Sequence, residues 1–214
     1  MSIKYQYYDK DEQNIESESH YNADGDYHCE DGPALIKYAE NGNIQSRQYF
    51  LNGELHRADG PAEVKYLKNG APRSEQYYIK GQKHRLEGAA FIKYTETGKI
   101  KEEEYYVEGR KHKDNGPAAV CYYKNGQVRT ERYWLEGQQH RREGPAKINY
   151  HQNGDIKLAQ FWIENEDIAN ELDDWVFEHG IPEKFAKWSK DDLALFVRSF
   201  ADFSPKKYED EDAL

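Results

Sequence analysis

Histidine recurs in this chain at a constant spacing of 28 residues, without insertion or deletion between the copies. The five copies are His28, His56, His84, His112 and His140. Glycine keeps the same spacing three residues before and four residues after each histidine, and tyrosine keeps it ten residues after. A fixed period of this size predicts a stacked repeat protein in which each unit contacts mainly its neighbours. Such a protein offers a long binding surface in place of one pocket.

Each repeat reads as one β-hairpin. In the second copy, apolar residues alternate with others from Ala62 to Tyr66, which is the period of a half-buried strand. Asn69-Gly70 follows, and this pair tolerates the positive φ of tight hairpin turns before a second strand. The predicted fold is therefore mainly β, an elongated and twisted antiparallel meander of five stacked 28-residue β-hairpin repeats over residues 25–163.

The two ends of the chain depart from the repeat. Residues 1–24 are expected to form a degenerate capping hairpin in the same register, because terminal repeats are atypical where they cap an array. After Trp162 the pattern stops, and apolar residues at helical spacing predict a short α-helical cap over residues 164–204, with Ser189 as an N-cap. These helices should cover the apolar surface and the unpaired strand edge of the last hairpin. Residues 205–214 are expected to be an acidic, disordered tail.

Composition indicates a folded chain that is not exported. Aromatic residues reach 14% although hydrophobic residues amount to 37%, so we expect a thin layer that buries rings and no thick aliphatic core. No run approaches the ~20 apolar residues of a membrane span, and residues 1–10 lack the apolar segment of a signal peptide. Cys29 and Cys121 lie three repeats apart, which is too far for a disulfide. Free thiols and a cytoplasmic location are therefore expected.

The net charge of −10 belongs mainly to the ends of the chain. Residues 1–24 carry 2 basic and 6 acidic side chains, residues 25–163 carry 22 and 19, and residues 164–214 carry 6 and 15. The repeats are thus slightly basic, which permits nucleic-acid binding without favouring it. The acidic C-terminal segment could also imitate phosphate on a partner that binds nucleic acid.

The repeated histidines do not predict a metal site. Equivalent residues of successive hairpins lie two strand spacings apart, roughly 10 Å, whereas Zn–N bonds are ~2.0–2.1 Å. We expect each imidazole to bond to the backbone or to an acid of its own loop, such as Asp59. The arginine or lysine that follows four of the five histidines (Arg57, Arg85, Lys113 and Arg141) is expected to pair with that acid or to lie over a ring.

The sequence carries no signal of catalysis. It contains no nucleophile elbow, phosphate loop or HExxH motif. Aspartate and histidine recur from unit to unit, whereas catalysis needs a single asymmetric constellation of residues. We therefore expect a protein that is not an enzyme, with no catalytic residues, no metal and no cofactor.

Binding residues are sought among side chains that vary between repeats and among the rings. Ala34, Ile36 and Tyr38 recur in kind on the first strand and are expected to form the packed face, opposite a variable and mostly wettable one. Two adjacent positions of the second strand both carry rings, so each face of the sheet receives one ring per repeat unless a bulge re-aims a row. Either both rows are buried, or one row contacts a partner. The predicted partner-binding residues are Phe50, Tyr78, Tyr106, Trp134, Trp162, Lys37, Lys65 and Lys93.

The repeat also resembles a known family. The motif reads His56-Arg57-x-Asp59-Gly60-Pro61-Ala62 and continues with Tyr66, Asn69-Gly70 and Tyr77. It is similar to the MORN-repeat-variant class, in a subtype found in bacterial, phage and giant-virus proteins, and the likeness covers residues 25–163. The third copy, Leu86-Glu87-Gly88-Ala89, lacks both the Asp and the Pro. No functional residue transfers from the family.

The resemblance implies a β-hairpin meander used for binding. Antitoxin-like relatives imply a protein that binds and neutralises another protein, and eukaryotic MORN proteins imply membrane association and scaffolding. We therefore expect a non-enzymatic scaffold that binds a partner protein, as an inhibitor or antitoxin-like protein or as a phage protein acting against host defence. The alternatives are a membrane-surface scaffold that uses the basic row and a nucleic-acid-binding scaffold that uses rings among basic side chains. The oligomeric state stays open.

Overall fold

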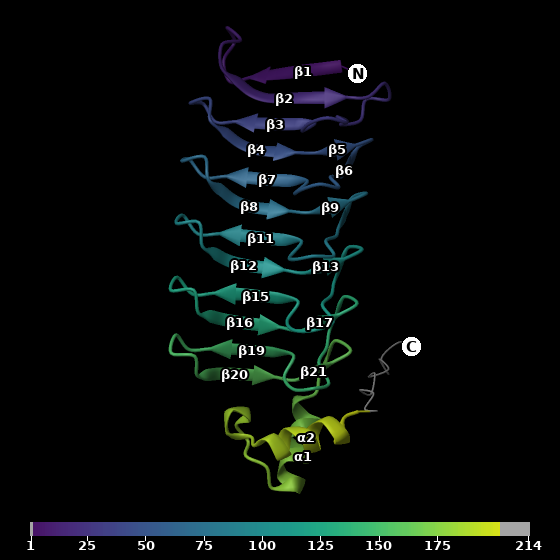
Figure 1. The fold of residues 1–214 in the computed structure, drawn as a ribbon, viewed down its shortest axis with the longest axis vertical. Helices are drawn as coiled ribbons and strands as arrows, with labels where there is room; N and C mark the ends of the chain where they lie inside the picture. Colours follow the sequence, from purple (N-terminus) through teal and green to yellow (C-terminus); the bar gives the residue numbers. More distant parts are fainter. Residues whose placement is uncertain (1, 202–214) are drawn as a thin grey trace, which may run out of the picture. The chain divides into compact units, whose positions relative to one another are not determined.

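The computed structural model describes residues 2–201, so the predicted tail at 205–214 and the last residues of the predicted cap lie outside the described residues. Twelve strands follow one another in chain order in one antiparallel meander, and the sheet is not closed (Figure 1). Helices follow the last strand, so the predicted mainly β fold with a C-terminal helical segment is confirmed. The strands of the sheet are β1 (Ser2–Tyr7), β2 (Ile15–Tyr21), β3 (Leu35–Tyr38), β4 (Ile44–Gln48), β7 (Glu63–Tyr66), β8 (Pro72–Gln76), β11 (Phe91–Tyr94), β12 (Ile100–Glu104), β15 (Ala119–Tyr122), β16 (Val128–Arg132), β19 (Lys147–Tyr150) and β20 (Ile156–Gln160).

The chain divides into two compact units. The first contains residues 2–111 and 121–126, and the second contains residues 112–120 and 127–201. In the first unit, β1 pairs with β2 as a hairpin ahead of the repeats. The repeat hairpins of this unit share one irregularity, a register shift just before the repeated tyrosine. It occurs at Lys37/Tyr38, Lys65/Tyr66 and Lys93/Tyr94.

The turn of each repeat hairpin contains more residues than the two-residue turn that the Asn-Gly pattern predicts. The Leu67 N–H donates to the Ala71 carbonyl at 2.8 Å, and the Gly70 N–H donates to the Leu67 carbonyl at 2.9 Å. Gly70 has a φ of +81°, whereas the Asn69 side chain accepts the Ala71 N–H at 3.0 Å. Gly70 thus supplies the left-handed residue and Asn69 satisfies a backbone donor, so the pair does not form a two-residue type I′ turn.

The segments that lead to His56, His84, His112, His140 and Ile168 each contain a second, shorter hairpin, which the sequence pattern did not predict. Its strands are two residues long, and a type I′ turn joins them because both turn residues have positive φ, as at Lys80 (48°) and Gly81 (73°). The short strands are β5 (Phe50–Leu51), β6 (Glu54–Leu55), β9 (Tyr78–Ile79), β10 (Gln82–Lys83), β13 (Tyr106–Val107), β14 (Arg110–Lys111), β17 (Trp134–Leu135), β18 (Gln138–Gln139), β21 (Trp162–Ile163) and β22 (Glu166–Asp167).

In the first unit, both faces of the sheet bury side chains. Ala34 and Ala62 are fully buried, as expected of the packed face. Leu35 and Glu63, on the opposite face, are each only 7% exposed, so the expectation that this face is mostly wettable was wrong at its first position. The physical reason lies in long side chains that cover this face. The amides of Gln48 and Gln76, for example, both donate to the Glu63 carboxylate.

The second unit has an aromatic core that its helices complete. α1 (Ala169–His179), the 3-10 helix η1 (Phe185–Lys187) and α2 (Lys190–Ser199) follow β22. Ser189 caps α2 as predicted, since its side chain accepts the Asp192 N–H and its own N–H donates to the Asp192 carboxylate. The buried core consists of Phe161, Ile163, Ile168, Trp175, Val176, Ile181, Phe196 and Phe200.

The helices of this unit cover the apolar side of its last hairpin, as expected. Phe161 contacts Phe196 with 5.1 Å between ring centroids and packs edge-on against Phe185 at 5.6 Å. A hollow of about 520 Å³ remains between β20 and the cap, and Leu158 and Trp188 help to line it. In the described part of the chain, no helix is both long enough and apolar enough to cross a membrane.

Candidate binding surface

The repeated histidines hold one hairpin to the next. The Nδ1 atom of each accepts the backbone N–H of the residue 24 positions later, at 3.1–3.2 Å. The donors are Asn52, Lys80, Glu108, Glu136 and Glu164, and each of them is the first residue, with positive φ, of a type I′ turn. The prediction of a backbone partner is confirmed, but the partner comes from the next hairpin. The histidines are therefore scaffold residues.

Acids of the histidine's own loop contribute in some copies. His112 Nε2 lies 3.1 Å from the Asp114 carboxylate, and His28 Nε2 lies 3.8 Å from that of Glu30. Burial lowers the pKa of His140, and nearby Arg142 lowers it further. Among residues 2–201, no group of three or more His, Cys, Asp or Glu side chains is placed to hold a metal ion.

The arginines that follow the histidines lie over rings, as predicted. The guanidinium carbon of Arg85 is 3.9 Å from the centroid of Tyr77, and that of Arg141 is 3.7 Å from Tyr133. Arg57 lies 4.1 Å from the centroid of Tyr49 and also pairs with its loop acid. These stacks occupy one of the two aromatic rows of the second strands.

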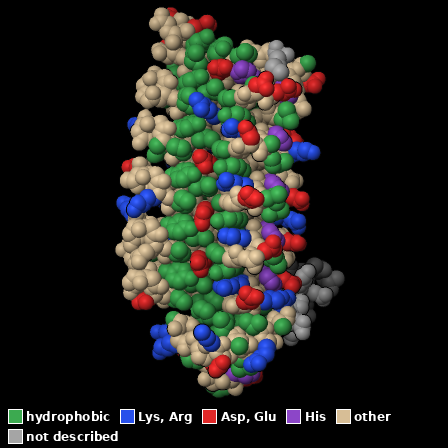
Figure 2. All heavy atoms as spheres, in the orientation of Figure 1, with side chains coloured by type: hydrophobic (Ala, Val, Ile, Leu, Met, Phe, Trp, Pro, Cys, Tyr) green, Lys and Arg blue, Asp and Glu red, His purple; other side chains and the backbone are tan. Residues whose placement is uncertain are grey.

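The same face carries repeated tyrosine–glutamate hydrogen bonds. The Tyr94 hydroxyl donates to Glu75 at 2.9 Å, and the Tyr150 hydroxyl donates to Glu131 at 2.8 Å. Burial, followed by this bond, raises the pKa of Tyr94. Figure 2 shows such a face, on which hydrophobic side chains gather in a column over the strands with acidic side chains among them. The side chains that keep the 28-residue spacing here are engaged with one another.

The second aromatic row lies at the first residues of β5, β9, β13, β17 and β21, outside the 12-stranded sheet, and its tyrosines bond to side chains of the variable face. The Tyr78 hydroxyl donates to Gln76 at 3.2 Å, and the Tyr106 hydroxyl donates to Glu104 at 2.8 Å. The Lys83 ammonium lies 5.1 Å from the centroid of Tyr106 and 6.0 Å from that of Tyr78, and burial lowers its pKa. Both tyrosines are half-buried, so this row is partly engaged within the first unit.

The other members of this row have different surroundings. Phe50 lies with its ring centroid 5.2 Å from that of Tyr27, in the first unit. Trp134 and Trp162 belong to the second unit and are half-buried. The indole N–H of Trp162 is buried and has no hydrogen-bond partner among the described residues.

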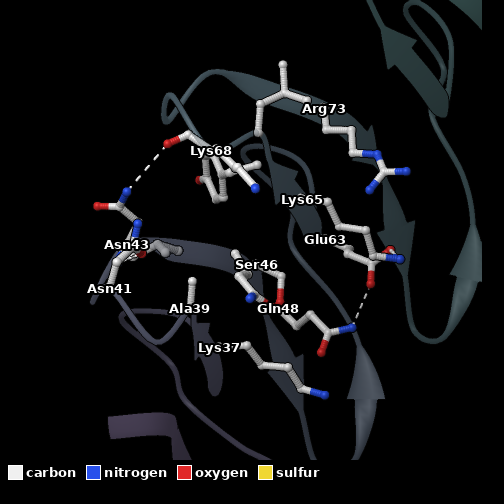
Figure 3. A pocket seen from close by; sticks show the side chains of 14 residues that line it. Lys37, Ala39, Asn41, Asn43, Ser46, Gln48, Glu63, Lys65, Lys68 and Arg73 are labelled. Carbon is white, nitrogen blue, oxygen red and sulfur yellow. Dashed lines mark hydrogen bonds and ion pairs between the residues drawn. The ribbon is translucent and has the colours of Figure 1, made fainter. Parts of the chain in front are cut away.

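The variable face of the first unit contains an open hollow of about 680 Å³ over β3, β4, β7 and β8 (Figure 3). Four cationic side chains line it: Lys37, Lys65, Lys68 and Arg73. Polar side chains, among them Asn43, Ser46 and Gln48, line it together with Glu63, and the remaining lining residues are Ala39, Ile44, Tyr66 and Leu67. Two of the predicted binding residues, Lys37 and Lys65, therefore meet at one site, whereas Lys93 is not among the side chains that line it.

Sequence reasoning missed Lys68 and Arg73. Both lie at or beside the hairpin turn, where the type of residue changes from copy to copy. Position 68 is Glu40 or Glu96 in the neighbouring copies, so no row of cations runs along it. One signal in the sequence could have found the site. Three positions that vary between copies are all basic in the second repeat, at Lys65, Lys68 and Arg73.

Comparison of the chain with family models, curated proteins and solved structures finds no match. Function is therefore inferred from the arrangement of the side chains themselves.

Proposed function

We propose that this chain is a non-enzymatic scaffold that binds a partner protein on the variable face of its sheet. The observation that supports the proposal is that repeated positions and variable positions of the 28-residue unit have different roles. Side chains that keep the 28-residue spacing are used within the scaffold: His84 accepts the backbone N–H of Glu108, and Arg85 lies over the Tyr77 ring. Side chains that differ between copies line a hollow open to solvent. A surface of this kind can be adapted to a partner without changing the scaffold.

The hollow and its rim offer the residue types that proteins use to bind one another. Tyrosine and arginine dominate the energetics of protein interfaces. Arg73 borders the hollow, and Tyr78 and Tyr106 lie half-buried on the same face. These side chains act as contacts in the proposed scaffold, and no cofactor or metal takes part.

The biological role proposed is that of an inhibitor or antitoxin-like protein, in the form of a phage protein acting against host defence. The support for it is the resemblance of the repeat motif to MORN-repeat-variant proteins with antitoxin-like members. A rigid array of hairpins also suits neutralisation, because a preformed surface loses little conformational entropy on binding.

The test is affinity capture from the native host followed by mass spectrometry. The bait proteins are the wild type and the Tyr78→Ala/Tyr106→Ala/Trp134→Ala variant, with circular dichroism to confirm that both fold. One dominant protein that the variant fails to capture supports the proposal and identifies the aromatic row as its contact. Capture of no specific protein, together with turnover of a substrate by the isolated chain, would overturn it.

Binding to an anionic membrane surface is the second candidate, and the basic hollow is the observation that favours it. Lysines near a surface of acidic lipid contribute about 1 kcal/mol each. The net charge of −10 opposes this attraction, so binding would depend on low salt. Flotation with phosphatidylserine vesicles at low ionic strength measures it, and the absence of binding there eliminates this candidate.

A further inference from the structure

The hollow of the first unit holds an excess of positive charge that the described chain does not neutralise. Lys65 lies 3.5 Å from the Glu63 carboxylate, which offsets one of the four cations. The other three, Lys37, Lys68 and Arg73, are exposed, and none makes an ion pair within the described residues. Cations gathered around a concave site raise the local concentration of an anionic ligand and steer its approach. The site therefore selects for negative charge.

The strength of such a site depends on several charges acting together. An exposed ion pair contributes only about 0.2–1 kcal/mol, so one carboxylate would bind too weakly to be detected. Three cations around a single hollow can each take an acid from one flexible chain, because the second and third contacts are then intramolecular. The ligand is thus expected to carry several negative charges in a row.

The polar lining distinguishes an acidic polypeptide from a phosphate backbone. Gln48 donates its amide N–H to Glu63, and its carbonyl oxygen remains to accept. The side chain of Asn43 donates to the Lys68 carbonyl at 3.4 Å, which likewise leaves an oxygen to accept. These acceptors can receive the N–H groups of a polypeptide, whereas a phosphodiester backbone has no donor to offer them.

The aromatic content of the hollow also favours an acidic polypeptide over a nucleic acid. Tyr66 is the one ring among the side chains that line this described pocket, and the Arg47 guanidinium lies 5.8 Å from its centroid. Single-stranded nucleic acids gain much of their affinity by stacking bases on successive rings. A ladder of rings is missing from this hollow, although it exists elsewhere on the same face at Tyr78 and Tyr106.

We infer that the hollow binds an acidic polypeptide segment of the partner protein, with its carboxylates at Lys37, Lys68 and Arg73. The inference rests on the proposed function and adds the chemistry of the partner. Glu63 at the base of the hollow is held by the Gln48 and Gln76 amides and by Lys65, so it fixes the lysine and presents little free negative charge.

The experiment measures fluorescence anisotropy of a labelled peptide in which Glu-Asp pairs alternate with Ser-Gly pairs. The protein is the full chain as wild type and as Lys68→Glu/Arg73→Glu. The matched control is Lys124→Glu/Arg129→Glu, which reverses the charges at the equivalent positions of another hairpin and gives the same net charge. All four side chains are exposed, so the variants are expected to fold.

The wild type should bind the acidic peptide, and added salt should weaken this binding. The hollow variant should lose about tenfold or more in affinity, because two attractions become repulsions, and the control variant should change by less than about threefold. A peptide with Gln-Asn in place of Glu-Asp should not bind. Equal affinity of both variants for the acidic peptide, or no binding by the wild type, would overturn the inference.

Two further probes separate the other anionic ligands. Oligothymidylate and phosphatidylserine vesicles are tested with the same three proteins. If either binds to the wild type and is lost in the hollow variant, while the acidic peptide does not bind, the ligand class is wrong. If the host partner is captured equally by the wild type and the hollow variant, the proposed function stands and the acidic-segment inference fails.

Discussion

At the scale of single residues, each repeat stabilises a backbone conformation that its own sequence disfavours. Lys80, Glu108 and Glu136 have φ near +48° in type I′ turns, a region that costs a side-chain-bearing residue about 1–2 kcal/mol. The histidine of the preceding hairpin accepts the N–H of this residue. The repeated histidine is thus explained by a hydrogen bond to the backbone that joins two hairpins.

Replacing one of these histidines should weaken the first unit. His84→Ala removes the acceptor of the Glu108 N–H, which lies at 3.1 Å, and should lower the free energy of unfolding by about 1–2 kcal/mol. Urea denaturation followed by circular dichroism measures the change. His151→Ala is the matched control, because His151 is exposed and does not keep the 28-residue spacing. Equal effects of the two substitutions would contradict the role assigned to His84.

The tyrosine–glutamate bonds allow a second comparison at this scale. Tyr94→Phe removes a hydroxyl that donates to Glu75 at 2.9 Å, and it should lower the free energy of unfolding by about 1 kcal/mol. Tyr66 occupies the same position in the preceding repeat, and its ring contacts Arg47. Tyr66→Phe keeps that contact and should change stability by less than about half as much. Thermal denaturation of both variants tests whether the hydroxyl or the ring matters.

At the scale of elements, periodicity predicted the hairpins and the cap but not the short hairpins. Alternating apolar residues marked β7, and a stripe with an N-cap marked α2. The turn at Lys80-Gly81 gave little signal, because lysine does not favour positive φ and tertiary hydrogen bonding overrides the preference. The wrong expectation for the face of Leu35 and Glu63 has a similar origin. Burial there depends on side chains brought in from neighbouring strands.

The capping box of α2 should be needed for the stability of the helical cap. Ser189→Ala removes the acceptor of the Asp192 N–H and should lower the free energy of unfolding of this region by about 1 kcal/mol. Hydrogen exchange of the backbone amides in α2 should accelerate accordingly. Ser199→Ala, at the other end of the same helix, serves as the control and should leave exchange near its wild-type rate. If Ser199→Ala accelerates exchange as much as Ser189→Ala, the cap is not the cause.

At the scale of the whole molecule, the fold was far more predictable than the site. The residues that build the scaffold recur in five copies of the repeat, whereas the residues of a binding surface occur in one place only. Lys37 and Lys65 could be named from their row, but Lys68 and Arg73 join them only because the turn between β7 and β8 brings both beside the side chains of β3 and β4. A repeated sequence therefore predicts the fold well, but it does not show which of the differences between copies serve binding.

The stability of the second unit should depend on pH through His140. Burial and Arg142 hold the pKa of His140 below its unfolded value near 6.5, so the folded state binds fewer protons than the unfolded state. The contribution of His140 to the free energy of unfolding is therefore complete above about pH 6.5, and it is lost as the pH falls through the lowered pKa of the folded state. A proton on Nδ1 of His140 would also abolish its bond to the Glu164 N–H.

Urea denaturation at about pH 7.5, 6.5 and 5.5 should consequently show a falling free energy of unfolding for the wild type. His140→Asn places an amide oxygen where it can accept the Glu164 N–H without titrating, so this variant should lose less stability over the same range. His151→Asn should follow the wild-type profile, since His151 is exposed. A His140→Asn profile as steep as that of the wild type would show that acid acts elsewhere in the chain.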